Sequence, residues 1–314
     1  MTGIGHGTIH SSAEHRSGIL LVAGGSIAWS SAGLLARLAD TDVWTTSFWR
    51  AVFCALFLTA IILIFERRDL LRTIIGLGRP GIIVASLLSI DAILFIIALD
   101  HTSVANALFI MATTPFVAAL LGRVVLKERV RPKTWVAIGG AFCGIALMVS
   151  SSLGSASLLG DGLAIVVTIN FAIAMILMRR HRTINMRPAV WLSAIISILL
   201  TLPFASPLAV STIDFSVLFA FGVFEMGLGL VLFTAGAQRI PPVEAAMIAI
   251  LESILSPFWV WLFLDENPGS RTILGGIIVI AAVAAHTIGD LRPARAAKLA
   301  PAKTSGAAAP PADR

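Results

Sequence analysis

Long apolar runs alternate with short polar segments along most of the chain. About ten of these runs reach the roughly 17 to 25 residues that a helix needs to cross the hydrocarbon core of a bilayer. They lack the strict apolar and polar alternation of barrel strands, so each run predicts a helix that satisfies its own backbone groups. The expected spans are 18–38, 44–65, 81–99, 103–125, 134–150, 160–178, 188–206, 214–236, 241–264 and 272–289.

The composition agrees with this pattern. Of the 314 residues, 57% are hydrophobic and only 13% are charged, whereas about 25% of the residues of a soluble domain are charged. The predicted fold class is therefore an all-α integral membrane protein with ten transmembrane helices, surrounded by the lipid bilayer.

The basic residues indicate how the chain is oriented in the membrane. The net charge of +6 is not gathered on one segment, because most basic residues follow the even-numbered spans. Those after the second, fourth and sixth spans are Arg67, Arg68, Arg72, Arg79, Arg123, Lys127, Arg129, Arg131, Lys133, Arg179, Arg180, Arg182 and Arg187. By the positive-inside rule these segments and both termini are cytoplasmic. We expect a multi-pass protein of the inner (plasma) membrane with no nucleic-acid partner.

The two ends of the chain differ from the rest. Residues 1–17 predict a short cytoplasmic segment, and the apolar run behind them is too long for the core of a cleaved signal peptide. Residues 290–314 are rich in Ala, Pro and basic residues and predict a disordered cytoplasmic tail. Cys54 and Cys143 lie inside apolar runs without the spacing of metal ligands. We expect neither a metal nor another cofactor.

The sequence repeats itself once. At an offset of 138 residues, 104–128 aligns with 242–266, and at an offset of 142, Trp49 aligns with Trp191. Two repeats of five helices follow, over residues 18–150 and 160–289. Because five is odd, the second repeat must enter the membrane from the opposite side. Such an inverted repeat is typical of secondary transporters, which bind their substrate near the midplane between the repeats.

Several motifs are similar to those of a known family. Trp29 is followed eight residues later by Arg37, and the second span contains "FWRAVF". Pro115 precedes Glu128 by thirteen residues, and residues 251–266 read "LESILSPFWVWLFLDE". Over roughly residues 18–290 this pattern resembles the EamA-type transporters of the drug/metabolite transporter (DMT) superfamily. The resemblance implies a ten-helix fold and transport of a small molecule, because members carry amino acids, nucleotide sugars, vitamins, drugs and other metabolites.

Three acidic residues lie near the middle of predicted spans: Asp91, Glu225 and Glu252. Each charged side chain at that depth costs about 2.5 to 3.5 kcal/mol on insertion scales, so such residues are expected to face a protein-lined cavity. There, each acid could bind substrate or carry a proton in one state of a transport cycle. The alternative for each is a hydrogen bond that joins two helices.

Three further residues are candidates for a substrate site. Arg50 could pair with an acid or bind an anionic group, or it could extend to the nearby membrane surface, as long basic side chains often do. Asn170 could contact substrate or form a hydrogen bond between helices. Trp29 could line the site or pack against a neighbouring helix.

Two prolines lie inside predicted spans. Pro115 and Pro257 each lack the backbone N–H that a helix interior needs, so we expect a bend at each position. A bend one turn from a buried acid such as Glu252 could open and close as a gate. The alternative is a static bend that fits neighbouring helices.

Known catalytic and nucleotide-binding motifs are missing from the sequence. It contains no G-x-x-x-x-G-K-[ST], H-E-x-x-H or G-x-S-x-G pattern, so we expect no catalytic residue and no ATP-driven pump. The predicted function is secondary transport of a small metabolite, an amino acid or related organic solute, by alternating access and in the direction of export, with a proton as one candidate for the coupling ion. An intramembrane enzyme using Asp91 and Glu252, or a receptor or structural membrane protein, stays open as an alternative. The sequence leaves open whether the protein forms a homo-oligomer.

Overall fold

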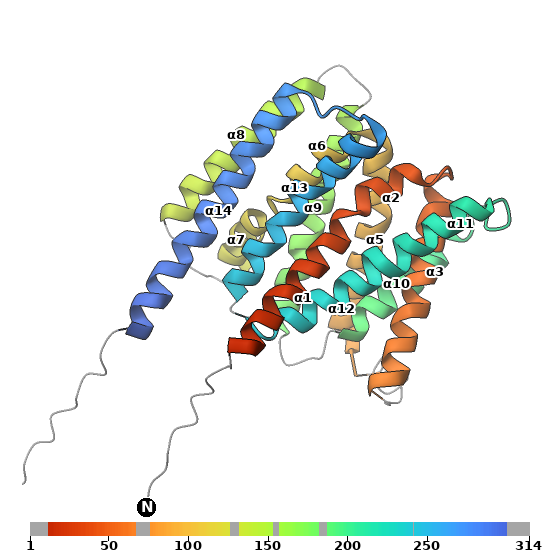
Figure 1. Ribbon diagram of the computed structural model, residues 1–314, viewed down its shortest axis with the longest axis horizontal. Coiled ribbons are helices and arrows are strands. Elements are labelled where there is room, and N and C mark those ends of the chain that lie inside the picture. The colour runs from red at the N-terminus through yellow and green to blue at the C-terminus, as the bar shows by residue number, and fades with distance from the viewer. Residues whose placement is uncertain are drawn as a thin grey trace, which may run out of the picture.

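The computed structural model describes residues 12–66, 76–125, 132–152, 157–181, 187–240 and 242–299, and these residues form helices and no strand (Figure 1). The helices of the first half are α1 (Ser12–Ser30), α2 (Ala32–Leu38), α3 (Val43–Ile61), the π-helix η1 (Ile62–Glu66), α5 (Gly78–His101), α6 (Val104–Met111), α7 (Thr114–Val125) and α8 (Pro132–Ser152). Those of the second half are α9 (Ser157–Arg180), α10 (Arg187–Thr201), α11 (Thr212–Phe219), the π-helix η2 (Ala220–Leu228), α12 (Gly229–Ala237), α13 (Pro242–Leu264) and α14 (Ser270–Leu299).

The prediction that the chain is helical is confirmed. The prediction of membrane spans is confirmed in part. Within the described residues, six helical segments are long and apolar enough to cross a membrane: Glu14–Leu38, Val43–Ile64, Gly78–His101, Val104–Val125, Ser157–Met178 and Thr212–Ala237. The other four expected spans fall on shorter apolar helices: Trp135–Ser150, Pro188–Thr201, Leu251–Leu264 and Ser270–Ala285. The total of ten membrane crossings therefore stays a prediction.

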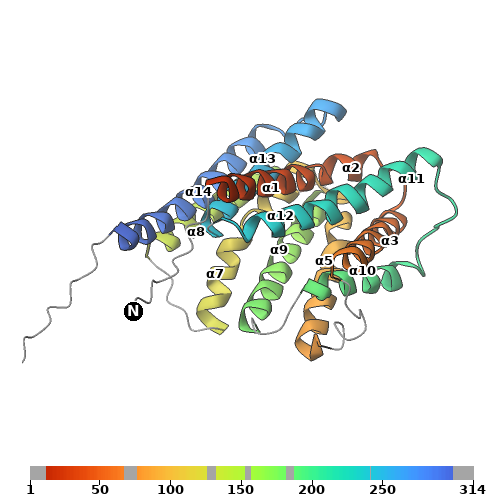
Figure 2. The same ribbon diagram turned by 60° about the horizontal axis from the view of Figure 1, so that its bottom comes forward.

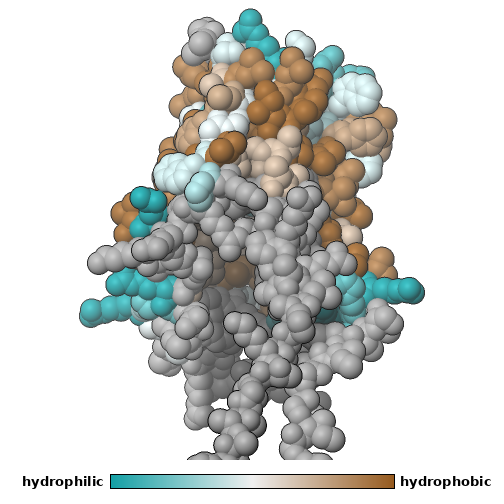
Figure 3. All heavy atoms as spheres, turned by 90° about the vertical axis from the view of Figure 1, so that its left-hand side faces the viewer, coloured by the Kyte–Doolittle hydropathy of each residue, from teal (hydrophilic) through white to brown (hydrophobic). Residues whose placement is uncertain are grey.

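The surface of the helices is apolar, as contact with lipid requires. Leu20, Val136 and Ile213 each expose more than 70% of their surface, and many other large apolar side chains are exposed. Figure 3 shows hydrophobic residues over much of the upper part of one such face. A soluble protein would rarely leave so large a continuous apolar surface in water.

The structure places the two prolines differently. The fourth expected span is broken at Ala112 and Thr113, between α6 and α7. Pro115 is therefore the second residue of α7. At the start of a helix a proline costs no backbone hydrogen bond. The loss of a hydrogen bond that the sequence analysis expected at Pro115, inside a continuous helix, therefore does not occur. Pro257, in contrast, lies inside the continuous helix α13.

Hydroxyl groups stabilise the break before Pro115. The Thr113 hydroxyl donates to the carbonyl of Ile110 at 2.6 Å, and the Thr114 hydroxyl donates to that of Met111 at 2.6 Å. These bonds satisfy carbonyl groups near the end of α6, for which lipid offers no partner. The break is therefore supported locally.

The helices pack into two bundles, each drawn from both halves of the sequence. In the first bundle, α1 and α2 pack with η2, α12 and α13. In the second bundle, α9 packs with α5, α6 and α7. Two further helix pairs join the halves: α3 packs with α10, and α8 packs with α14 (Figures 1 and 2).

These contacts have the pattern that two equivalent halves would produce. Exchanging each helix with its expected repeat partner turns the α1–α12 contact into α9–α5, and α1–α13 into α9–α7. The same exchange turns α3–η2 into α10–α5, while α3–α10 and α8–α14 are unchanged. The centre of the exchange lies where α3, α5, α10 and η2 meet, and this is where the candidate site is found.

Candidate functional site

A buried ion pair joins the two halves of the chain. Arg50 of α3 and Glu225 of η2 form this pair, with 3.1 Å between Arg50 Nη2 and Glu225 Oε2. Their side chains are only 8% and 7% exposed. Arg50 Nε also donates to Glu225 Oε2, at 3.3 Å. Arg50 thus lies inside the protein and does not extend to the membrane surface. Of the roles expected for it, the structure shows pairing with an acid.

Aromatic rings surround the Arg50 guanidinium. Its central carbon lies 4.7 Å from the ring centre of Phe221 and 5.7 Å from that of Phe95. The face of an aromatic ring attracts a cation, and more strongly where water is absent. The two rings therefore stabilise the charge of Arg50 where burial alone would disfavour it.

A π-helix positions Glu225. The nine residues of η2 interrupt the α-helical path from α11 to α12, and such π-helical turns occur frequently at functional sites. Gly222 brings this turn against α3, because a Cβ atom there would lie only 2.6 Å from the carbonyl oxygen of Arg50. A larger residue would separate η2 from α3 and hence Glu225 from Arg50.

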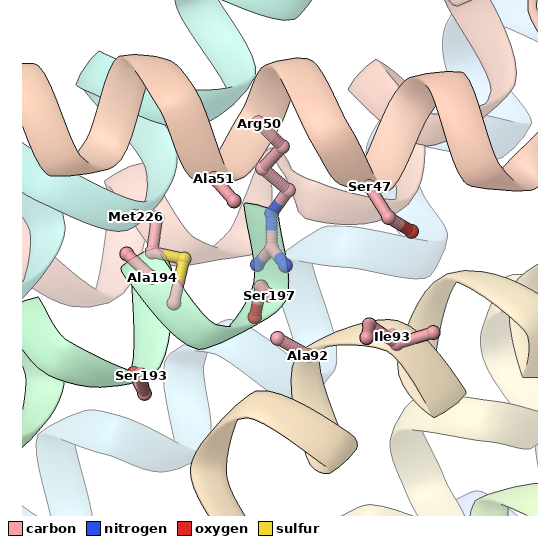
Figure 4. A pocket seen from close by; sticks show the side chains of 9 residues that line it. All are labelled: Ser47, Arg50, Ala51, Ala92, Ile93, Ser193, Ala194, Ser197 and Met226. Atoms are coloured by element: carbon pink, nitrogen blue, oxygen red, sulfur yellow. The ribbon is translucent and has the colours of Figure 1, made fainter. Parts of the chain in front are cut away.

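A small cavity lies beside Arg50 (Figure 4). Its lining comes from α3, α5, α10 and η2, so both halves contribute, and it has room for about one water molecule. The residues that line it are Ser47, Arg50, Ala51, Ala92, Ile93, Ser193, Ala194, Ser197 and Met226. The site is therefore almost closed in this structure.

Glu252 adds a second carboxyl group near the ion pair. It is half-buried on α13 and makes no hydrogen bond or ion pair with the described part of the chain. Its carboxyl group is close enough to that of Glu225 for the two charges to repel each other. Arg50 forms an ion pair with Glu225, so the Glu252 carboxyl group has no cationic partner among the described residues.

Asp91 belongs to a different contact. Asn170 of α9 donates through Nδ2 to Asp91 Oδ1 at 2.8 Å and to the carbonyl of Leu87 at 2.9 Å. Asp91 is only 7% exposed, and its Oδ2 atom has no hydrogen-bond partner. Asp91 and Asn170 thus form a polar contact between α5 and α9, within the second bundle.

Trp29 packs between helices of the first bundle. Its ring centre lies 4.8 Å from that of Phe233, and a Cβ atom at Gly229 would lie only 2.6 Å from the indole. Both partners belong to α12. The contacts of Trp29 are therefore packing contacts with a neighbouring helix, which was the alternative to lining the substrate site.

With this geometry in view, comparison with known proteins identifies the family. The sequence model of the EamA-like transporter family matches residues 16–150 and again residues 158–287. The chain belongs to the EamA-like transporter family. The family is part of the DMT superfamily, so the resemblance found in the sequence is confirmed. The two matches cover the same two regions as the internal repeat, and the family is one of membrane transporters, not of enzymes.

Solved structures share the fold of this EamA-like protein. One of 25 matching chains, titled "Crystal structure of protein", superposes with a TM-score of 0.58 over 88% of this chain and 99% of its own length. At 16% sequence identity the match shows the fold alone. No curated protein matches the sequence.

The structure of this EamA-like protein also reveals a buried acid that sequence reasoning missed. Asp161 of α9 is fully buried and accepts from the Thr102 hydroxyl at 2.6 Å and from Asn106 Nδ2 at 3.1 Å. The Thr272 hydroxyl of α14 in turn donates to Asn106 Oδ1 at 2.7 Å. The sequence feature that could have indicated this site is the acid in "GDG" at the start of an apolar run.

Not every sequence motif falls within the described residues. Glu128, part of the family pattern, lies outside them, as do most basic residues of the expected cytoplasmic loops. Within the described part of the chain, no three His, Cys, Asp or Glu side chains are grouped so that they could hold a metal ion.

Proposed function

We propose that this EamA-like protein is a secondary transporter that exports a small metabolite, an amino acid or a related organic solute, by alternating access. The observation that carries the proposal is the buried pair of Arg50 and Glu225, which joins the two halves beside a small cavity. We further propose that the protein lies in the inner (plasma) membrane with both termini in the cytoplasm. In this mechanism the two bundles move against each other, and the cavity opens alternately to the two sides.

The chemistry of the ion pair supports an amino acid as substrate. An amino acid carries one carboxylate and one ammonium group. The planar guanidinium of Arg50 suits a carboxylate, and Glu225 or Glu252 suits an ammonium. A bound amino acid can therefore replace the contacts that Arg50 and Glu225 make with each other when the site is empty.

The acids without a cationic partner support proton coupling. Asp91 and Glu252 have no salt bridge to a described residue, and an ionised carboxyl group is costly in a dry interior. A carboxyl group in such a place can hold a proton while the cavity is closed and release it when water enters. Substrate movement in one direction can thus be driven by proton movement in the other.

Flux through reconstituted vesicles tests this proposal. Vesicles containing the purified protein and loaded with radiolabelled amino acids should lose label faster than protein-free vesicles and faster than vesicles with Glu225→Gln. Arg271→Ala, which removes an exposed charge far from the ion pair, serves as the control and should retain flux. If the wild-type protein releases none of the amino acids faster than protein-free vesicles do, amino-acid transport is refuted.

A further inference from the structure

A second ion pair lies at the ends of the helices, on the side predicted to be external. Arg37, at the end of α2, donates through Nε to Glu266 Oε2 at 3.1 Å; Glu266 follows α13. Both side chains are 28% exposed, so water reaches the pair. Arg37 belongs to the first bundle, and Glu266 lies two residues beyond the end of a helix of the same bundle.

The pair contacts the second bundle through two backbone groups. Arg37 Nη2 donates to the carbonyl of Thr102 at 2.8 Å, and Glu266 Oε1 accepts from the N–H of Val104 at 3.2 Å. Thr102 directly follows α5, and Val104 begins α6. One member of the pair thus offers a donor and the other an acceptor to the same junction between two helices, and together they hold the bundles against each other.

A glycine allows the bundles to come this close. A Cβ atom at Gly33 of α2 would lie 2.2 Å from Val104 Cγ1, and also 3.0 Å from the Ser256 hydroxyl of α13. Side chains do not approach a Cβ atom to such distances, so only glycine permits this contact. The close packing at Gly33 and the hydrogen bond of Glu266 therefore both involve Val104, and Arg37 binds two residues earlier, at the carbonyl of Thr102.

A second cavity lies at this end of the molecule and has room for several water molecules. Its lining includes Arg37, Asp40, Thr46, Ile96 and Asp100. It lies one helical turn from the cavity of the ion pair, because Thr46 precedes Arg50 by four residues on α3 and Ile96 follows Ala92 by four residues on α5. A path from the outer cavity to Arg50 would run along the seam between α3 and α5.

We propose that Arg37 and Glu266 form the outer gate of this path. By docking on Thr102 and Val104 they hold α2 against α5 and α6 and keep the seam closed, so the outer cavity stays separate from the Arg50 site. Opening requires the two bundles to part here, which breaks the bonds of Arg37 and Glu266 to the second bundle and separates Gly33 from Val104. The role of the gate in transport rests on the proposed function, but the docking itself can be measured without a substrate.

Thiol labelling of purified protein in detergent tests the gate. In a background with Cys54→Ala and Cys143→Ser, the probe is Ser47→Cys, because Ser47 lines the closed cavity and is only 5% exposed. A polar maleimide should react slowly with this probe while the gate is intact. Arg37→Ala, Glu266→Gln and Gly33→Val should each speed the reaction roughly fivefold to tenfold, the scale expected when charge-assisted hydrogen bonds are lost from one of two states.

Each variant has a matched control. Arg271→Ala removes an exposed arginine near the same end, and Gly139→Val adds a side chain where no other group lies within 4 Å. Both should label at the slow rate. Size-exclusion chromatography and circular dichroism confirm that a variant is folded; should Gly33→Val misfold, Glu266→Gln still tests the gate.

A charge swap separates docking from a simple ion pair. Arg37→Glu with Glu266→Arg keeps two opposite charges but places a carboxylate beside the Thr102 carbonyl and a cation beside the Val104 N–H. The swapped protein should therefore still label fast. The gate is refuted if Arg37→Ala and Glu266→Gln label no faster than the controls, or if the swap restores slow labelling. Absence of flux in vesicles with the labelling result intact would instead refute the transport proposal alone.

Discussion

Arg50 and Glu225 are 175 positions apart in the sequence, yet their charged groups meet at 3.1 Å inside the helix bundle. The contact joins the second expected span of one half to the third expected span of the other. Neither charge could occupy this depth alone, because desolvation of an unpaired ion costs several kcal/mol. The pair therefore makes the position of each half depend on the other.

A double-mutant cycle should measure this dependence. Arg50→Ala and Glu225→Ala should each destabilise the protein by about 3 to 5 kcal/mol, because each leaves an uncompensated buried charge. The double variant should be far more stable than the sum of the two losses predicts. Thermal unfolding in detergent provides the comparison, and additive losses would show that the two charges do not interact.

Arg50→Lys should impair flux strongly while the protein still reaches the membrane. Arg50 contacts Glu225 through two different nitrogens, and a single ammonium group cannot reproduce that planar geometry. Vesicle flux, corrected for the amount of reconstituted protein, gives the measurement. Normal flux in the lysine variant would mean that only the charge of Arg50 is required.

Much of the fold could be predicted because membrane helices depend on local composition. Apolar runs without strand-like alternation indicated the helices, and acids inside those runs indicated where polar contacts would be. The sequence could not tell which of Asp91, Glu225 and Glu252 would pair with Arg50. That choice depends on the approach of η2 to α3 at Gly222 and on a π-helix, which turns every following side chain relative to an α-helix.

Bundle membership was equally hidden. The pattern of apolar residues predicts that α1 belongs to a membrane span but not that its neighbours are α12 and α13 of the other half. Asn170 was recognised as a polar residue in a span, but its partner Asp91 lies 79 positions away. Contacts of this kind depend on helix order in space, which single-sequence patterns do not contain.

Asp161 should matter for stability. Asp161→Ala should destabilise the protein by about 1 to 3 kcal/mol, because it leaves the buried donors of Thr102 and Asn106 without their acceptor. Asp100→Asn, a change at a nearby exposed acid, is the control and should leave the unfolding temperature almost unchanged. Equal unfolding temperatures for the two variants would show that the Asp161 contacts contribute little.

Labelling of intact cells should test the orientation. With native cysteines removed, a cysteine at Leu208 or Gly269 should react with a membrane-impermeant thiol reagent, because both exposed positions follow odd-numbered spans. A cysteine at Gly76 or His181, after even-numbered spans, should react only once the cells are permeabilised. Reaction at Gly76 and His181 in sealed cells would contradict the inverted repeat and the cytoplasmic termini.

Glu252 offers the sharpest test of proton coupling. It lies on α13, five residues before Pro257, near the charge of Glu225 and without a partner of its own among the described residues. If its carboxyl group takes up and releases a proton in each cycle, Glu252→Gln should fold and insert normally, because glutamine keeps the size and polarity of the side chain. Its flux should fall strongly and lose its dependence on pH, because glutamine cannot titrate.

The alternative role for Glu252 predicts different behaviour of the same variants. A residue that only joins helices through a hydrogen bond tolerates glutamine, and only Glu252→Leu should lower the stability, by about 0.6 to 2 kcal/mol. Vesicle flux measured from pH 5 to 9 (roughly the range in which a buried carboxyl group titrates) and thermal unfolding of both variants separate the two roles. Wild-type flux with an unchanged pH profile in Glu252→Gln would exclude this carboxyl group as the proton carrier, and Asp91, whose Oδ2 atom is buried without a partner, would then be the residue to substitute next.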